Sequence, residues 1–171
     1  NWNFGSERYW VATAAGNWSN TANWSLTSGG TGGATLPNGA QRAVFDGRGR
    51  GNCNIDTTVI VSTLTISTST AAGYSGRIDT SSNSITVSDF VQNFGTFYAD
   101  GSTITVGAGA FTLSSGTFNA RVSSITVSGD VTLSDGLFNG GTSYISVSGN
   151  LTNNLAAASQ FNAGMGTFNL T

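Results

Sequence analysis

The chain has 171 residues, 38% of them hydrophobic, which is enough to bury one core and predicts a single domain. Only 8% of the residues are charged, Lys and His are absent, and the net charge is −2, so the sequence lacks the basic surface that nucleic-acid binding requires. No apolar run approaches the roughly 18 to 20 residues that cross a bilayer, so we expect no membrane insertion.

The polar character of the chain comes from neutral side chains, because Ser, Thr, Asn and 24 glycines take the place of charged residues. This composition is unusual for a cytosolic protein. The sequence begins at Asn1 and not at Met, which a removed leader or an excerpt would explain, so we expect an extracellular or cell-surface location. Asn-x-Ser/Thr sequons begin at Asn17, Asn23, Asn150 and Asn169 and allow glycosylation where the source organism has the machinery.

Residues 1–50 differ in kind from the rest of the chain. They contain all four tryptophans and the only proline, separated by Gly-rich stretches. We therefore predict a cap or edge layer over residues 1–50, followed by one continuous solenoid domain over residues 51–171.

The motifs of this first block occur in a recognisable order. They are Tyr9-Trp10-Val11, Gly16-Asn17-Trp18-Ser19, Asn23-Trp24-Ser25, Ser28-Gly29-Gly30, Gly32-Gly33-Ala34, Pro37 and Val44-Phe45-Asp46. The order resembles the opening module of bacterial surface proteins and phage tail-associated proteins that continue into β-solenoid repeats. Two departures are Ala12-Thr13-Ala14-Ala15 in place of Gly-Gly and Gln41-Arg42-Ala43 in place of an acidic residue, so a ligand tied to that acid is not implied here.

A short alternating segment follows the Trp-rich block. Its apolar residues alternate with polar ones as in a half-buried strand, at Ile55, Val59, Val61, Leu64 and Ile66. The only cysteine, Cys53, precedes it, so no disulfide can form within the chain. We expect Cys53 to be a small buried hydrophobe, with an intermolecular disulfide as the alternative.

Residues 78–170 contain five copies of one unit, each with two apolar anchors seven residues apart. The second anchors, Ile85, Ile104, Ile125, Ile145 and Phe168, lie 19, 21, 20 and 23 residues apart. An alternating strand and a second apolar patch such as Phe111-Thr112-Leu113 complete each unit, which gives three short strands. Glycines mark the corners, where a positive φ is expected: Gly95, Gly116, Gly136, Gly101, Gly129 and Gly149.

This periodicity predicts a right-handed parallel β-solenoid of about six coils, with three short strands per coil of about 20 residues. Stacked coils place equivalent residues above one another in interior ladders. The expected ladders are Ile78, Phe97, Phe118, Phe138 and Phe161; Ile85, Ile104, Ile125, Ile145 and Phe168; and Val87, Val106, Val127, Val147 and Leu170. An antiparallel sandwich is the main alternative, but it does not require anchors to recur every 20 residues.

The polar residues show no catalytic pattern. Only Asp56 and Asp79 form a recurring acidic position, because both follow an Ile and precede a Thr and can stack one coil apart. We interpret the acids as turn-capping or solvated residues, and we predict no enzyme activity and no catalytic residue. Without His and without calcium-binding repeats, we expect no metal and no cofactor. The outward column Thr86, Thr105, Thr126 and Ser146 is either a glycan-binding array or an ordinary strand surface.

The two ends of the chain lead to the functional hypothesis. The last coil contains strands at Phe161 and Phe168–Leu170 but no third strand, and such an open coil invites pairing. The segment Asn1-Trp2-Asn3-Phe4 can supply that strand from a second copy, with Trp2 and Phe4 inward; the alternative is that it folds over its own first coil.

We therefore predict a structural subunit of an extracellular filament or fibre, assembled head to tail with copies of itself as partners. The alternative is an adhesion or phage tail-fibre module, excerpted from a longer protein, that binds surface glycans.

Overall fold

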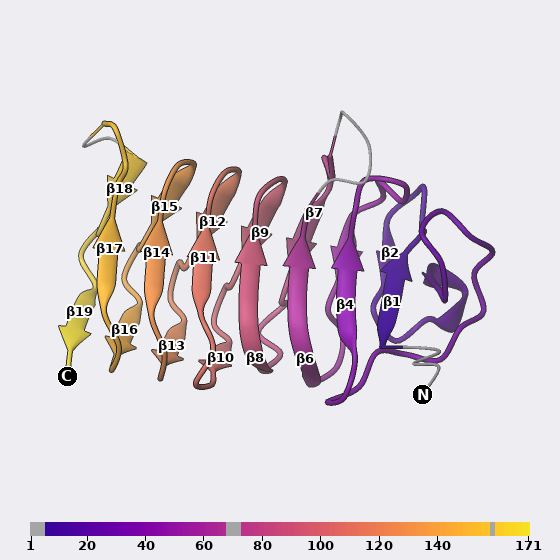
Figure 1. Ribbon diagram of the computed structural model, residues 1–171, viewed down its shortest axis with the longest axis horizontal. Coiled ribbons are helices and arrows are strands. Elements are labelled where there is room, and N and C mark those ends of the chain that lie inside the picture. The colour runs from indigo at the N-terminus through magenta and orange to yellow at the C-terminus, as the bar shows by residue number, and fades with distance from the viewer. Residues whose placement is uncertain (1–5, 68–72, 158–159) are drawn as a thin grey trace.

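The computed structural model describes residues 6–67, 73–157 and 160–171. These residues form a parallel β-solenoid of about six turns, and they contain strands and short 3₁₀ turns but no α-helix. Figure 1 shows the coils side by side along the long axis, with the N-terminal block at one end and the C-terminal strand β19 at the other. The predicted parallel β-solenoid is confirmed.

Three walls enclose the core. Wall 1 is a seven-stranded sheet of β2 (Gly16–Asn17), β5 (Cys53–Asn54), β7 (Arg77–Asp79), β9 (Thr96–Tyr98), β12 (Thr117–Asn119), β15 (Leu137–Asn139) and β18 (Phe161–Asn162). Walls 2 and 3 belong to one twelve-stranded sheet. Wall 2 contains the first halves of β6 (Val59–Ile66) and β8 (Ile85–Gln92), then β10 (Thr103–Val106), β13 (Ser124–Val127), β16 (Tyr144–Val147) and β19 (Thr167–Leu170).

Wall 3 contains β1 (Glu7–Trp10), β4 (Arg42–Phe45), the second halves of β6 and β8, then β11 (Phe111–Leu113), β14 (Val131–Leu133) and β17 (Leu151–Asn153). Within β6 and β8 the chain runs from wall 2 to wall 3 as one eight-residue strand, whereas later coils break there. All described strand pairs are parallel except β1 with β3 (Trp24–Ser25), and the 3₁₀ turn η1 (Thr21–Asn23) precedes β3. Because β1 and β4 lie in wall 3, the ladder extends into residues 1–50.

Apolar side chains stack in register inside these walls. In wall 1, Ile78, Phe97, Phe118, Phe138 and Phe161 lie opposite one another in successive coils, and Cys53 extends the ladder to β5. In wall 2, the other two expected sets are aligned from Val59 to Phe168 and from Val61 to Leu170. The phenylalanine rings of Phe97 and Phe118 stack at 5.2 Å with planes 6° apart, so like packs on like along the axis.

The corners differ in part from expectation. Gly95, Gly116 and Gly136 have φ of 66°, 81° and 89°, as predicted, and their backbones stack closely. At the next corner the positive φ falls on Asp100 (43°) and not on Gly101, and neither Gly129 nor Gly149 has a positive φ. Those two glycines are required by close packing, because a Cβ on Gly129 would lie 1.7 Å from the carbonyl oxygen of Gly109.

Candidate functional site at the two ends and along wall 1

The N-terminal end is sealed by a cluster of aromatic side chains. Trp10, Trp18, Trp24 and Phe45 are buried, with ring centroids of Trp18 and Trp24 4.6 Å apart and those of Trp10 and Phe45 5.5 Å apart. Two indole N–H groups are satisfied, since Trp10 donates to the Gly51 carbonyl at 2.9 Å and Trp24 to the Trp18 carbonyl at 2.8 Å. These residues carry the motif order noted in the sequence, and their role in the structure is packing.

The strand edges at this end are covered by the chain itself. The Asn17 carbonyl of β2 accepts the side-chain N–H of Asn23 at 2.9 Å, and the Trp24 carbonyl of β3 accepts the amide of Ala34 at 3.0 Å. Gly32 packs so closely that a Cβ would lie 1.8 Å from the Ala22 carbonyl oxygen, so position 32 accepts only glycine. The N-terminal end therefore offers few free backbone groups for pairing.

The C-terminal end is open in the described part of the chain. Here β17, β18 and β19 each pair with a neighbour on one side only, so three strand edges end the walls. Among the described residues, the last strands of walls 1 and 2 are β18 and β19, and the last strand of wall 3 is β17 from the preceding coil. Leu170 is 57% exposed and Met165 is 90% exposed, so exposed apolar side chains lie on and just before β19.

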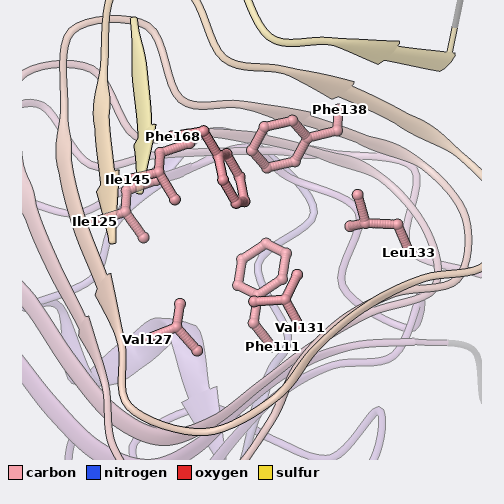
Figure 2. Close-up of a pocket in the computed structure, with 8 residues that line it drawn as sticks. All are labelled: Phe111, Ile125, Val127, Val131, Leu133, Phe138, Ile145 and Phe168. Atoms are coloured by element: carbon pink, nitrogen blue, oxygen red, sulfur yellow. The ribbon is translucent and has the colours of Figure 1, made fainter. Parts of the chain in front are cut away.

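An apolar space lies inside the last coils. Figure 2 shows side chains from all three walls that point toward its centre: Phe111, Ile125, Val127, Val131, Leu133, Phe138, Ile145 and Phe168. Among the lining residues, Phe168 lies on β19, and the residues from wall 3 lie on β11 and β14. The space is lined entirely by carbon side chains, and its volume of about 10 Å³ is close to the minimum that holds one water molecule, so it is a packing gap in the core.

The sequence-predicted interface residues lie in this region. Phe161 and Phe168 are half-buried, with ring centroids 6.1 Å apart, and Leu170 lies opposite Val147 at the open edge. Trp2 and Phe4, the proposed contributors from a second copy, lie outside the described residues.

The expected stacking of Asp56 on Asp79 is wrong. Asp79 lies opposite Asn54, because Cys53 and not Ile55 continues the wall 1 ladder. Asp56 instead binds the N-terminal block, where it accepts the Ser19 amide at 2.9 Å and the Ser19 hydroxyl at 2.6 Å. Burial opposes ionisation of Asp56, but these hydrogen bonds prevail and lower its pKa.

Asp79 has a different acidic neighbour, Asp100. Burial raises the pKa of Asp79, and a hydrogen bond shared with Asp100 raises it further. Burial also acts on Asp100, but hydrogen bonds from Asp79 and Arg121 lower the pKa of Asp100. Arg77 pairs with Asp79 at 2.9 Å and Arg121 with Asp100 at 2.5 Å. The four side chains thus satisfy one another, and within the pair Asp79 is the more easily protonated carboxyl.

Other chemical groups are isolated. No group of three or more His, Cys, Asp or Glu side chains able to hold a metal occurs among the described residues. Cys53 is 1% exposed and burial raises the pKa of its thiol, so it is an unreactive member of the wall 1 ladder. No helix in the described ranges is long and apolar enough to span a membrane.

Sequence reasoning missed a polar column on the outer face of wall 1. The outward residues Asn17, Asn54, Asp79, Tyr98, Asn119, Asn139 and Asn162 lie opposite one another along the wall, and we call them the amide strip. Amides bond along it, with Asn139 Nδ2 donating to Asn119 Oδ1 at 2.9 Å and Asn54 Nδ2 to Asn17 Oδ1 at 3.2 Å. The signal was visible as an Asn directly after Phe118, Phe138 and Phe161.

Comparison with known proteins returned no match for this chain, neither to a protein-family model, nor to a curated protein, nor to a solved structure.

Proposed function

We propose that this chain is a non-enzymatic structural subunit of an extracellular fibre, in which copies join head to tail through the open last coil. The unpaired strand edges carry the proposal: among the described residues β17, β18 and β19 each pair on one side only, and the exposed apolar side chain of Leu170 lies on β19. Unpaired strand edges beside apolar surface are the features by which sheets add a further strand.

The partner that fits is a second copy, through its segment Asn1–Phe4. This segment alternates polar and apolar residues, as a strand with one buried face does, and it carries two aromatic side chains that can cover exposed apolar groups such as Leu170. The covered edges of the N-terminal block disfavour bare stacking of one solenoid on the next. A donated strand avoids that obstacle, and a head-to-tail contact that does not close on itself produces a fibre.

A second candidate function is an adhesion or tail-fibre module that binds surface glycans. The motifs between Tyr9 and Asp46 resemble those of bacterial surface and phage tail-associated solenoid proteins, and this resemblance supports an extracellular location for either function. The amide strip on wall 1 favours the second candidate, because it places hydrogen-bonding groups along the side of the rod.

The test of fibre assembly is the double variant Trp2→Ser and Phe4→Ser. We expect it to melt like the parent chain in circular dichroism but to form no fibres in electron micrographs, because the donated strand loses its apolar anchors. The matched control, Asn1→Ser and Asn3→Ser, changes the alternate positions and should assemble normally. Free Asn1–Phe4 peptide should inhibit assembly of the parent chain. Normal fibres from the double variant would contradict the donated strand, and a parent chain that stays monomeric would contradict the fibre.

A further inference from the structure

The outer face of wall 1 combines a polar column with a hollow. At the N-terminal part of the amide strip, the surface is hollowed between Asn17, Asn52, Asn54, Arg77 and Asp79. The hollow lies over β2 and β5, and Ala15, Gly16 and Cys53 also line it. Arg77, whose side chain is 51% exposed, forms the rim.

Several polar groups of this face have unused hydrogen-bonding capacity. The side-chain N–H groups of Asn52 and Asn119 and the hydroxyl of Tyr98 have no hydrogen-bond partner among the described residues, whereas the Asn52 oxygen accepts the Arg77 amide at 2.9 Å. These groups are held on rigid parallel strands, which fixes their spacing along the rod. Fixed, unpaired donors on a strand wall are suited to a ligand with many hydroxyl groups.

The electrostatics of the face favour a neutral ligand. Its charged groups are balanced in pairs, Arg77 with Asp79 and Arg121 with Asp100, and the whole chain has a net charge of only −2. The two guanidinium groups also lie against the Tyr98 ring, at 5.2 Å and 4.9 Å from its centroid, which holds the ring in place. The face therefore has no electrostatic potential of a single sign that would attract a polyanion or a polycation.

We propose that the hollow at Asn52 and the amide strip from Asn54 to Asn139 bind a neutral polysaccharide laid along the solenoid axis. Successive coils repeat at about 4.8 Å, close to the length of one sugar unit in an extended β-linked chain, so each coil can meet one sugar. Amide side chains bond the sugar hydroxyls, and the pair Arg77–Asp79 supplies a donor and an acceptor side by side at 2.9 Å. The site lies on the side of the rod, so it does not depend on end-to-end assembly.

Co-sedimentation with insoluble cellulose, chitin and β-1,3-glucan tests the site, with sedimentation of the protein alone subtracted so that fibres do not count as binding. The variant Tyr98→Thr and Asn119→Thr removes a ring and an amide while keeping residues that wall 1 already carries at Thr96 and Thr117. We expect its binding to at least one of these polysaccharides to fall by about tenfold, as the loss of two hydrogen bonds implies.

The control variant Thr105→Ala and Thr126→Ala alters the outward column of wall 2 and should bind like the parent chain. Both variants should keep the parent melting curve, and Asn52→Ala offers a milder change in the hollow if Tyr98→Thr unfolds the chain. Binding that falls only with the wall 2 variant would overturn the site, as would equal binding by all the variants. Failure of the parent chain to sediment with any of the three polysaccharides would overturn the ligand class.

Discussion

Asp79 occupies a position where the amide strip has Asn in five other strands. Its neighbours across the strands are Asn54 and Tyr98, and Asp100 lies close enough to share a proton. Because burial and Asp100 both disfavour the charged form, the carboxylate is the less suitable group for this position at neutral pH. An amide would continue the strip and could still donate a hydrogen bond to Asp100.

We therefore expect Asp79→Asn to stabilise the fold at pH 7. The raised pKa of Asp79 means that its contribution to stability is full when it is protonated and is lost as the pH rises through the folded-state pKa. At pH 7 the variant should therefore have a higher free energy of unfolding than the parent chain, by less than about 1 kcal/mol. The ion pair with Arg77 that the substitution removes contributes little, because the Arg77 side chain is exposed. It should vanish near pH 3, below the usual aspartate pKa of about 3.9. Urea unfolding of the parent chain and of Asp79→Asn at pH 7 and pH 3 tests this prediction. An equal gain in stability at both pH values would contradict the raised pKa of Asp79.

At the scale of the strand and corner, glycine spacing sets how closely the coils approach. Gly129 and Gly107 both follow a wall 2 strand, yet only Gly129 is in tight contact, with a Cβ 1.7 Å from the Gly109 carbonyl oxygen. A Cβ on Gly107 would lie 3.5 Å from the Val87 carbonyl oxygen, an ordinary contact.

Gly129→Ala should therefore lower stability by about 1 to 3 kcal/mol, because the corner must move away from its neighbour. Gly107→Ala is the matched control and should be neutral or slightly stabilising, since alanine reduces the freedom of the unfolded chain. Thermal melts followed by circular dichroism compare the two. Equal melting temperatures for the two variants would show that coil contact at Gly129 is looser than described.

Much of the coil could be predicted from the sequence, because the anchors of walls 1 and 2 recur at a nearly constant spacing and must all face one core. The register between Asp56 and Asp79 could not. A shift of two residues keeps every side chain on the same face of a strand, so the shared Ile-Asp-Thr pattern fits two registers equally well. The structure selects the other one, with Cys53 opposite Ile78.

The candidate sites were predictable to different degrees. The places of Phe161 and Phe168 in the wall 1 and wall 2 ladders follow from the repeat, because both anchors continue the spacing of the earlier coils. The amide strip was overlooked because outward positions carry no burial signal, and Asn is common throughout this chain. The fusion of walls 2 and 3 in β6 and β8 also escaped prediction, because both halves read as the same alternating pattern.

At the scale of the whole molecule, the solenoid is a linear array in which each coil contacts only its neighbours. Ile125 is 2% exposed and lies between Ile104 and Ile145, so a change there affects two coil interfaces. Leu170 lies opposite Val147 alone and is already 57% exposed, so a change there affects one. The cost of the same substitution should therefore depend on its place along the rod.

We expect Ile125→Asp, like Phe118→Asp, to cost several kcal/mol, because it buries a charge between two coils. That is a large part of the about 5 to 15 kcal/mol that holds a typical domain, so the chain should fail to fold. Leu170→Asp should leave the melting temperature almost unchanged and speed amide hydrogen exchange in β19 alone. Thr126→Asp, which is exposed beside Ile125, controls for the added charge and should fold normally. Similar losses for Ile125→Asp and Thr126→Asp would contradict the register of wall 2, and loss of protection throughout the rod in Leu170→Asp would contradict a linear array.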